Sequence, residues 1–108
     1  MDLQVAALEK ATAAAEKAGY ELRLYVSGAT PNSTRALANI RRICEEHLAG
    51  RYQLEIIDVY QNPALAREDQ IIALPTLVKK MPKPMHRLVG DMSNEQKVLA
   101  GLNLRPKL

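Results

Sequence analysis

Thiol chemistry in this 108-residue chain is restricted, because it contains a single cysteine, Cys44. A dithiol–disulfide cycle within one chain requires two sulfurs, so that chemistry is excluded, together with an internal disulfide and a cysteine-based zinc site. Cys44 lies in the middle of an apolar helical stripe and not at a helix start, where the pKa of a thiol would fall. We therefore expect a buried structural cysteine; an enzyme that uses this one thiol is the alternative.

Histidines and carboxylates are the other groups that could bind a metal ion or transfer a proton. His47 and His86 stand far apart in the sequence and neither has a third ligand at a metal-binding spacing, so we expect no metal, no cofactor and exposed or edge histidines. We expect Asp58 to make local backbone contacts at the end of a strand. Glu68 and Asp69 lie near the C-terminal end of a short helix, where anions are unfavourable. Solvent, an ion pair and a partner contact are the alternatives for these two carboxylates.

The charge of the chain gives little sign of a nucleic-acid or membrane partner. Fifteen basic residues stand against 12 acidic ones, and neither Trp nor Phe is present to stack on bases. No apolar run approaches the ~18 residues of a membrane span, and the N-terminus has no secretory-signal pattern, so we expect a cytoplasmic protein. The densest basic stretch, "KKMPKPMHR" (79–87), is interpreted as a contact for an acidic protein partner or as an ordinary charged hairpin.

The residues from about position 20 to 60 have the pattern of a βαβ unit. "ELRLYVS" (21–27) alternates apolar and polar residues as a half-buried strand does, and "YQLEIIDVY" (52–60) is a second strand. Between them Thr30 can cap a helix that has Pro31 in its first turn and runs to about Leu48. Two strands joined by such a helix form a right-handed unit with a parallel strand pair. The helix face expected to contact the core carries Leu37, Ile40, Cys44 and Leu48.

The segment before this unit, "DLQVAALEKATAAAEKA" (2–18), is rich in helix-forming residues. Its apolar face is mostly alanine and would bury little surface, and Gly19 can end the helix. We therefore divide the chain into an N-terminal helical extension (1–19) and one domain (20–108). A short frayed helix and a contact between subunits are the two alternatives for the extension.

The second half predicts a short helix, two strands and a last helix. Their expected ranges are 63–70, 71–80, 86–90 and 94–102. Pro75 interrupts the first of these strands, and an S-x-x-Q capping box at Ser93 to Gln96 opens the last helix. The order of elements, βαβ followed by α, β, β and α, is the thioredoxin-like plan of an α/β protein. Pro75 stands where that fold has a proline preceded by a cis peptide bond.

Local preference in this second half is weak. Pro75, Pro82 and Pro84 fall within ten residues, and each removes a backbone donor from any strand that contains it. Gly101 within the last helix costs about 1 kcal/mol relative to alanine. A weak preference permits two packings of similar free energy.

Four stretches occur in an order that is typical of one family. They are "LYVSGATPNSTRAL" (24–37), "IIDVYQNPALAREDQIIALPTL" (56–77), the prolines of "MPKP" (81–84) and "RLVGDMSNEQKVLAGL" (87–102). Together they resemble the KaiB family of circadian-clock proteins, from about Glu21 to Asn103.

This resemblance implies a non-catalytic regulatory protein without a cofactor. KaiB-like proteins bind the N-terminal ATPase ring of KaiC, a RecA-like hexamer, and in cyanobacteria thereby sequester KaiA and act on histidine-kinase signalling. The resemblance also implies two packings: a tetrameric ground state and a rare thioredoxin-like monomer that binds KaiC. Both share the first βαβ half and differ in the second. In a crystal we expect the ground state, because high protein concentration favours an oligomer, whether tetramer or dimer.

The functional positions of the family carry over to this chain in part. Arg35 and Lys79 match basic positions, whereas Glu55 and Gln70 stand where lysines are common. The residues that we expect at the partner interface are Arg35, Glu55, Gln70, Lys79, His86 and Arg87. Those that we expect to take part in the change of packing are Pro75, Pro82, Pro84, Gly101 and Asn103. Replacement of Gly101 is expected to favour the thioredoxin-like state, and an aspartate is frequent at the position of Asn103.

Departures from the family pattern favour a homologue outside the core cyanobacterial oscillator, with its own KaiC-type ATPase as partner. The family's acidic C-terminal tail is replaced by "RPKL", and the lysines at positions 55 and 70 are missing. KaiA-like and histidine-kinase signalling proteins stay open as further partners. The alternative function is a permanently thioredoxin-like sensor or adaptor module for a signalling partner, like the domain that begins related histidine kinases.

Overall fold

The computed structural model describes residues 19–104, and its elements follow the predicted order of βαβ, α, β, β and α. The strands are β1 (Tyr20–Val26), β2 (Tyr52–Asp58), β3 (Thr76–Met81) and β4 (His86–Val89). The helices are α2 (Pro31–Leu48), α3 (Pro63–Glu68) and α4 (Glu95–Gly101). The predicted helical extension lies outside the described residues except for Gly19, so the division into extension and domain stays a prediction.

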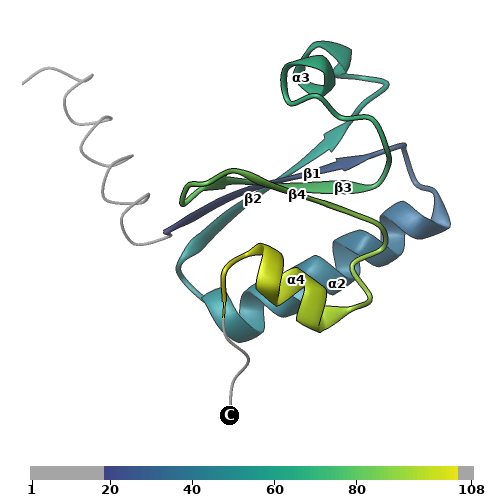
Figure 1. The fold of residues 1–108 in the computed structure, drawn as a ribbon. Coiled ribbons are helices and arrows are strands. Elements are labelled where there is room, and N and C mark those ends of the chain that lie inside the picture. Colours follow the sequence, from purple (N-terminus) through teal and green to yellow (C-terminus); the bar gives the residue numbers. More distant parts are fainter. Residues whose placement is uncertain (1–18, 105–108) are drawn as a thin grey trace, which may run out of the picture.

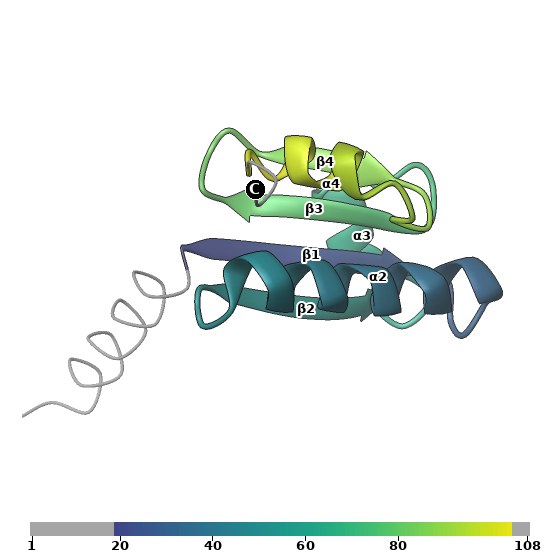
Figure 2. The same cartoon turned by 90° about the horizontal axis from the view of Figure 1, so that it is seen from below.

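The four strands form one mixed sheet in the order β2-β1-β3-β4. β1 pairs in parallel with β2 and antiparallel with β3, which in turn pairs antiparallel with β4. Helices α2 and α4 cover one face of the sheet, and α3 lies on the other (Figure 1). Seen from the side of the two helices, α2 runs along β1 and β2 while α4 lies over β3 and β4 (Figure 2). This arrangement is thioredoxin-like.

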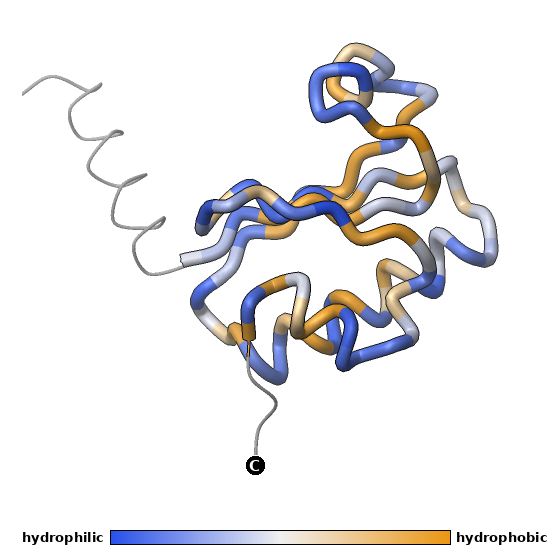
Figure 3. Tube along the Cα trace, viewed as in Figure 1, coloured by the Kyte–Doolittle hydropathy of each residue, from blue (hydrophilic) through white to orange (hydrophobic). Residues whose placement is uncertain are grey.

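The βαβ unit forms as its sequence predicts. The Thr30 side chain accepts a hydrogen bond from the Ser33 N–H at 3.3 Å, and Pro31 occupies the first turn of α2, where a missing N–H costs nothing. Leu22 and Leu24 of β1 point into the core between the sheet and the helices. Figure 3 shows hydrophobic stretches along the strands and hydrophilic ones at the turn that joins β3 to β4.

The main core lies between the sheet and the layer of α2 and α4. The fully buried residues of α2 include Ala36, Ile40, Ile43, Cys44 and Leu48. Leu37, which the helical spacing also assigned to the core, is only partly buried at its edge. A second, smaller cluster on the opposite face joins Tyr25, Ile57 and Val78 to the side chains around α3.

Three details of the predicted elements differ from the structure. The strand expected at 71–80 begins only at Thr76, because Pro75 cannot donate to the ladder and instead its carbonyl accepts from the Gly90 N–H at 3.0 Å. The cap of α4 is Asn94 and not Ser93: Asn94 Oδ1 accepts from the Lys97 N–H at 3.1 Å. Strand β2, predicted to run to Tyr60, ends at Asp58 and lies at the edge of the sheet, where its Ile56 is 37% exposed.

Pro75 lies where the thioredoxin-like plan puts it. The peptide bond between Leu74 and Pro75 is cis, as that plan predicts. Pro82 and Pro84 lie in the turn between β3 and β4. The described C-terminal half thus has the thioredoxin-like packing, and the tetrameric packing that we expect in a crystal stays a prediction.

Candidate partner-binding surface

A buried carboxylate, Asp69, organises the side of the sheet that carries α3. Asp69 is 3% exposed, and its Oδ1 accepts from Lys80 Nζ at 2.6 Å. Its Oδ2 accepts from the Tyr25 hydroxyl at 2.5 Å and from Arg23 at 3.1 Å. Its backbone carbonyl accepts from Arg87 Nε at 2.9 Å. These five residues, the Asp69 cluster, join the end of α3 to β1, β3 and β4.

Hydrogen bonds to the Asp69 carboxylate offset the cost of burying its charge. Burial alone would raise the pKa of Asp69, but hydrogen bonds from Lys80, Tyr25 and Arg23 outweigh it and hold that pKa below its ordinary value. The pKa of Tyr25 rises to about 12, mainly because burial disfavours the phenolate and because its hydroxyl donates to the Asp69 carboxylate. Asp69 is therefore an anion and Tyr25 a neutral donor at neutral pH.

The sequence left solvent, an ion pair and a partner contact as alternatives for Asp69. In the structure, Asp69 forms ion pairs with Arg23 and Lys80. Sequence reasoning missed the donors, although β1 carried a signal for two of them. Leu22 and Leu24 face the main core, so strand alternation places Arg23 and Tyr25 on the opposite face. What the sequence did not show is that the short helix α3 ends above them. Asp58 makes the local contact that we expected, since its Oδ1 accepts from the Tyr60 N–H at 2.9 Å.

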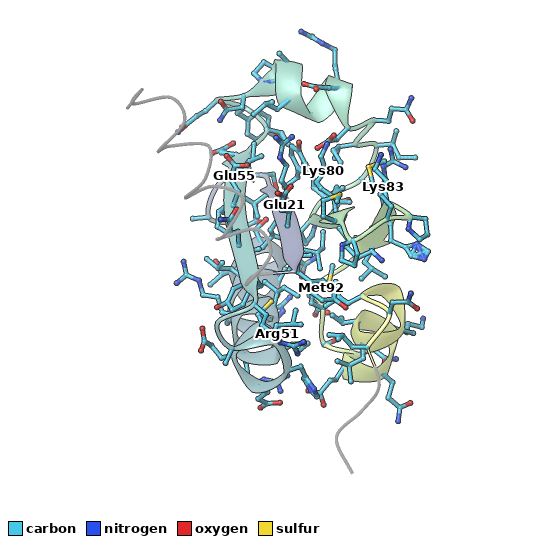
Figure 4. All side chains as sticks on the ribbon, turned by 90° about the vertical axis from the view of Figure 1, so that its left-hand side faces the viewer. Glu21, Arg51, Glu55, Lys80, Lys83 and Met92 are labelled. Carbon is cyan, nitrogen blue, oxygen red and sulfur yellow. The ribbon has the colours of Figure 1, made fainter. Side chains whose placement is uncertain are left out.

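Three of the six predicted interface residues lie on the α3 side of the sheet. Glu55 on the edge strand β2 is exposed and pairs with Arg23 Nε at 3.2 Å. Gln70, two residues after the end of α3, is exposed, with a positive φ of 56°. Arg87 on β4 holds the Asp69 carbonyl. Figure 4 shows Glu21, Glu55 and Lys80 on this side, around a hollow of about 310 Å³ that Arg23 also lines.

The other three predicted interface residues lie elsewhere. Arg35 projects from α2, where it contacts Asn32 and lies 3.5 Å from the Asp91 carboxylate. Lys79 alternates with residues of the α3 side, so it faces the helical layer, and at 2% exposure it is not at the surface in this packing. His86, its partner in the β3–β4 register, is exposed on the edge strand.

Two exposed apolar side chains belong to the segments on either side of α3. Ile72 is 97% exposed and Tyr60 is 78% exposed, and they flank α3 in the sequence. The open, charged hollow is unlike the enclosed, mostly apolar pocket of a small-molecule site, and exposed apolar side chains on the same domain suit contact with a protein. We call this region the α3-side surface: Glu21, Glu55, Tyr60, Gln70, Ile72, Lys80 and Arg87.

The predicted fold-switch residues lie in the part of the chain that follows α3. Pro75 is buried directly before β3. A Cβ added to Gly101 would lie 2.6 Å from both Cδ atoms of Leu88, so α4 packs closely on β4 at this point. Asn103 follows α4 with a positive φ of 62°. Their role in a change of packing stays a prediction.

Cys44 is buried, as its position in the helical stripe predicted. It is 0% exposed, and burial raises the pKa of its thiol to about 12. A thiol with that pKa supplies almost no thiolate at neutral pH, which argues against nucleophilic use of this residue.

Comparison with known proteins identifies the family. A family model described as the KaiB domain matches residues 23–104. The chain belongs to the KaiB family. It is 54% identical over 85 residues to the circadian clock oscillator protein KaiB of Thermostichus vulcanus, with 79% of each chain covered. It is 50% identical over 86 residues to the circadian clock protein KaiB3 of a Synechocystis species, covering 80% of this chain and 84% of that protein.

Solved structures agree on the fold of this KaiB-family chain. The N-terminal domain of SasA from Synechococcus elongatus matches with a TM-score of 0.64, at 22% identity, over 82% of this chain and 88% of that one. Chloroplastic thioredoxin z matches with a TM-score of 0.62, at 21% identity, over 89% of this chain and 88% of that one. Membership of this family makes the protein a regulatory protein of clock type. No helix within residues 19–104 is long and apolar enough to cross a membrane.

Proposed function

We propose that this protein is a non-catalytic regulator that binds a KaiC-type ATPase ring in the thioredoxin-like packing and leaves a tetrameric packing to do so. The observation that carries the proposal is its identity of 50–54% to KaiB clock proteins over most of the chain. The buried single cysteine supports a role in binding in place of thiol chemistry. A cytoplasmic location belongs to the same proposal.

The α3-side surface is the face that we assign to the partner. It holds the exposed edge strand β2, whose outer backbone groups have no neighbouring strand among residues 19–104 and can pair with another chain. The cations Lys80 on β3 and Arg87 on β4 lie further across the sheet, and Ile72 and Tyr60 supply exposed apolar anchors. Arg35 and His86, on other faces, are proposed as secondary contacts.

The test is to mix the full-length chain with the KaiC-type ATPase of its own organism and ATP, and to follow the mixture by size-exclusion chromatography with light scattering over a day. We expect a complex that grows over hours while free tetramer declines, because the partner selects the thioredoxin-like packing. Absence of a complex at every time point would remove this function and leave the fold and family unchanged.

A pair of charge reversals locates the interface. Glu55→Lys places at the edge strand the residue that is common in the family, and we expect it to strengthen the complex by roughly two- to tenfold, since rim charges act mainly on association. Glu46→Lys makes the same charge change on the exposed side of α2, where its ion pair is with Arg42 of the same helix, and should leave the complex unchanged in metal-free buffer. Equal effects of the two variants would point to net charge and not to the α3-side surface.

A second candidate function, a permanently thioredoxin-like adaptor module, is favoured by the likeness to the SasA domain. Such a module would be a monomer at every concentration and would bind a signalling partner without a slow step. Light scattering over a hundredfold range of protein concentration separates the two functions. KaiA-like proteins and histidine kinases are the partners to add to the mixture if the ATPase alone forms no complex.

A further inference from the structure

The end of α2 and the start of α4 bring together a histidine and two carboxylates. Glu46, His47 and Glu95 each place one ligand atom within 4.8 Å of the other two. His47 Nε2 lies 3.8 Å from Glu46 Oε2 and 3.7 Å from Glu95 Oε1. Glu95 is far from the other two in sequence, and for this reason the spacing of the histidines could not show the cluster.

His47 is the residue that sets this cluster apart from ordinary surface charges. Its side chain is only 8% exposed, and its Nε2 is directed at both carboxylates at distances longer than a hydrogen bond. Within residues 19–104, its backbone carbonyl accepts from Arg51, but no hydrogen bond to its imidazole ring is found. A nearly buried imidazole ring that directs one nitrogen at two carboxylates without a hydrogen bond is placed as a metal ligand would be.

We propose that Glu46, His47 and Glu95 form a binding site for a divalent transition metal ion, with Zn²⁺ as the ion to test. Imidazole nitrogen and carboxylate oxygen are both ligands of Zn²⁺, and three protein ligands with one water complete a tetrahedral set. Around an ion with bonds of about 2.1 Å, tetrahedral ligand atoms stand about 3.4 Å apart. The two distances from His47 Nε2 are within about 0.4 Å of that value, and a rotation of the two glutamate side chains would bring their oxygens from within 4.8 Å of each other to the same spacing.

Arg42 is the group that competes with the ion. Its guanidinium lies 3.5 Å from Glu46 Oε1 and 3.3 Å from Glu95 Oε1. Both carboxylates therefore already have a cationic neighbour, which lowers the affinity for a second cation. An ion bound to His47 and one oxygen of each glutamate would leave Arg42 as an outer partner of the same carboxylates. Removal of its charge should strengthen metal binding.

The site would join two parts of the chain that have different roles in the proposed function. Glu46 and His47 belong to the βαβ half, and Glu95 begins the last helix of the second half. An ion that holds all three binds only when α4 lies against α2. This expectation rests on the proposed function: Zn²⁺ should raise the ratio of thioredoxin-like to tetrameric packing. The factor is 1 + [Zn²⁺]/Kd, which is about 100-fold when the Zn²⁺ concentration is 100 times Kd.

Titration calorimetry of the metal-free full-length chain with Zn²⁺ near neutral pH tests the site directly. We expect one ion per chain, binding at least about tenfold weaker in Glu95→Gln and His47→Ala, and tighter binding in Arg42→Gln. Glu95→Gln keeps the shape of the side chain and should not disturb the fold. Glu45→Gln, a neighbouring carboxylate outside the cluster, and His86→Ala, the other histidine, are matched controls that should bind as the unmodified chain does.

Two results would overturn the site: no binding at millimolar Zn²⁺, or equal binding by the unmodified chain and Glu95→Gln. Loss of binding in His86→Ala alone would overturn it as well, since the ion would then bind at the β4 edge. The link to packing is measured separately, as the monomer fraction with and without Zn²⁺. If the ion binds but the monomer fraction does not change, the coupling between the site and the packing is disproved and the site itself is retained. Failure of the site and failure of the proposed function therefore give different results.

Discussion

Asp69 is the residue on which the polar contacts of the α3 side converge. A buried carboxylate is costly unless hydrogen bonds compensate for the loss of water, and Asp69 has donors from Lys80, Tyr25 and Arg23. Arg23 in turn pairs with Glu55, so the cluster extends to the exposed edge strand. A substitution at Asp69 should therefore change both the free energy of unfolding and the side chains of the surface that we assign to the partner.

Replacement of Asp69 by Asn tests this balance. The amide keeps the shape and can still accept from Tyr25, but it removes the charge that neutralises Lys80 and Arg23. Both cations are about one quarter exposed and can turn toward solvent, so we expect a loss of about 2 kcal/mol in the free energy of unfolding. Urea denaturation followed by circular dichroism measures it.

Asp58→Asn is the matched control for this measurement. The Asp58 carboxylate accepts from the Tyr60 N–H, and an asparagine oxygen can replace it there. We expect a change below about 0.5 kcal/mol for this variant. If both substitutions cost the same, the stability does not depend on the charge of Asp69 or on its burial.

The same carboxylate predicts how stability depends on pH. The pKa of Asp69 is lower in the folded protein than its ordinary value, so the native state binds a proton less readily than the unfolded chain does. The stabilisation from this group is fully present above the ordinary pKa of about 4 and is lost as pH falls through the lower folded value. Urea denaturation between neutral pH and pH about 3 should show the unmodified chain losing its advantage over Asp69→Asn at the acidic end. A constant difference across this range would contradict the prediction.

At the scale of the elements, the parts that the sequence predicted are those governed by local rules. Thr30 and Pro31 start α2, and the alternation in β1 places its leucines in the core, because capping and strand period depend on neighbours in the chain. The start of β3 was missed by several residues, since the segment before it packs against α3 as a loop. The Asp69 cluster and the Glu46–His47–Glu95 cluster were also missed. Both depend on contacts between elements far apart in sequence, which no local pattern encodes.

The contact between α4 and β4 carries a prediction of its own. Gly101→Ala gains about 1 kcal/mol of helix propensity, yet its Cβ would lie 2.6 Å from both Cδ atoms of Leu88. We expect the variant to favour the thioredoxin-like packing more strongly in a Leu88→Ala background, because the crowding is then removed and the gain remains. The monomer fraction in light scattering, compared across the two single variants and the double variant, measures this coupling. An identical effect of Gly101→Ala in both backgrounds would show that the Leu88 side chain can move away from the new Cβ without a loss of stability.

At the scale of the whole molecule, the contacts that define this packing run between the two halves of the chain. Arg23 and Tyr25 come from the βαβ half, whereas Asp69, Lys80 and Arg87 come from the second half. A second packing that keeps only the βαβ half must exchange this whole set of contacts together. Under the proposed function a barrier would then separate the two packings, and we expect their exchange to be slow compared with diffusion of a partner.

This barrier predicts the kinetics of partner binding. If the ATPase binds only the thioredoxin-like packing, the observed association rate should rise with ATPase concentration and then reach a plateau set by the rate at which the tetramer converts. Stopped-flow or surface-based binding at increasing ATPase concentration measures the curve. Asp69→Asn, which weakens contacts specific to the thioredoxin-like packing, should lower the amount of complex formed, whereas Asp58→Asn should leave it unchanged. A rate that rises linearly to the highest ATPase concentration would mean that binding does not wait for a change of packing, and it would favour the permanently thioredoxin-like adaptor.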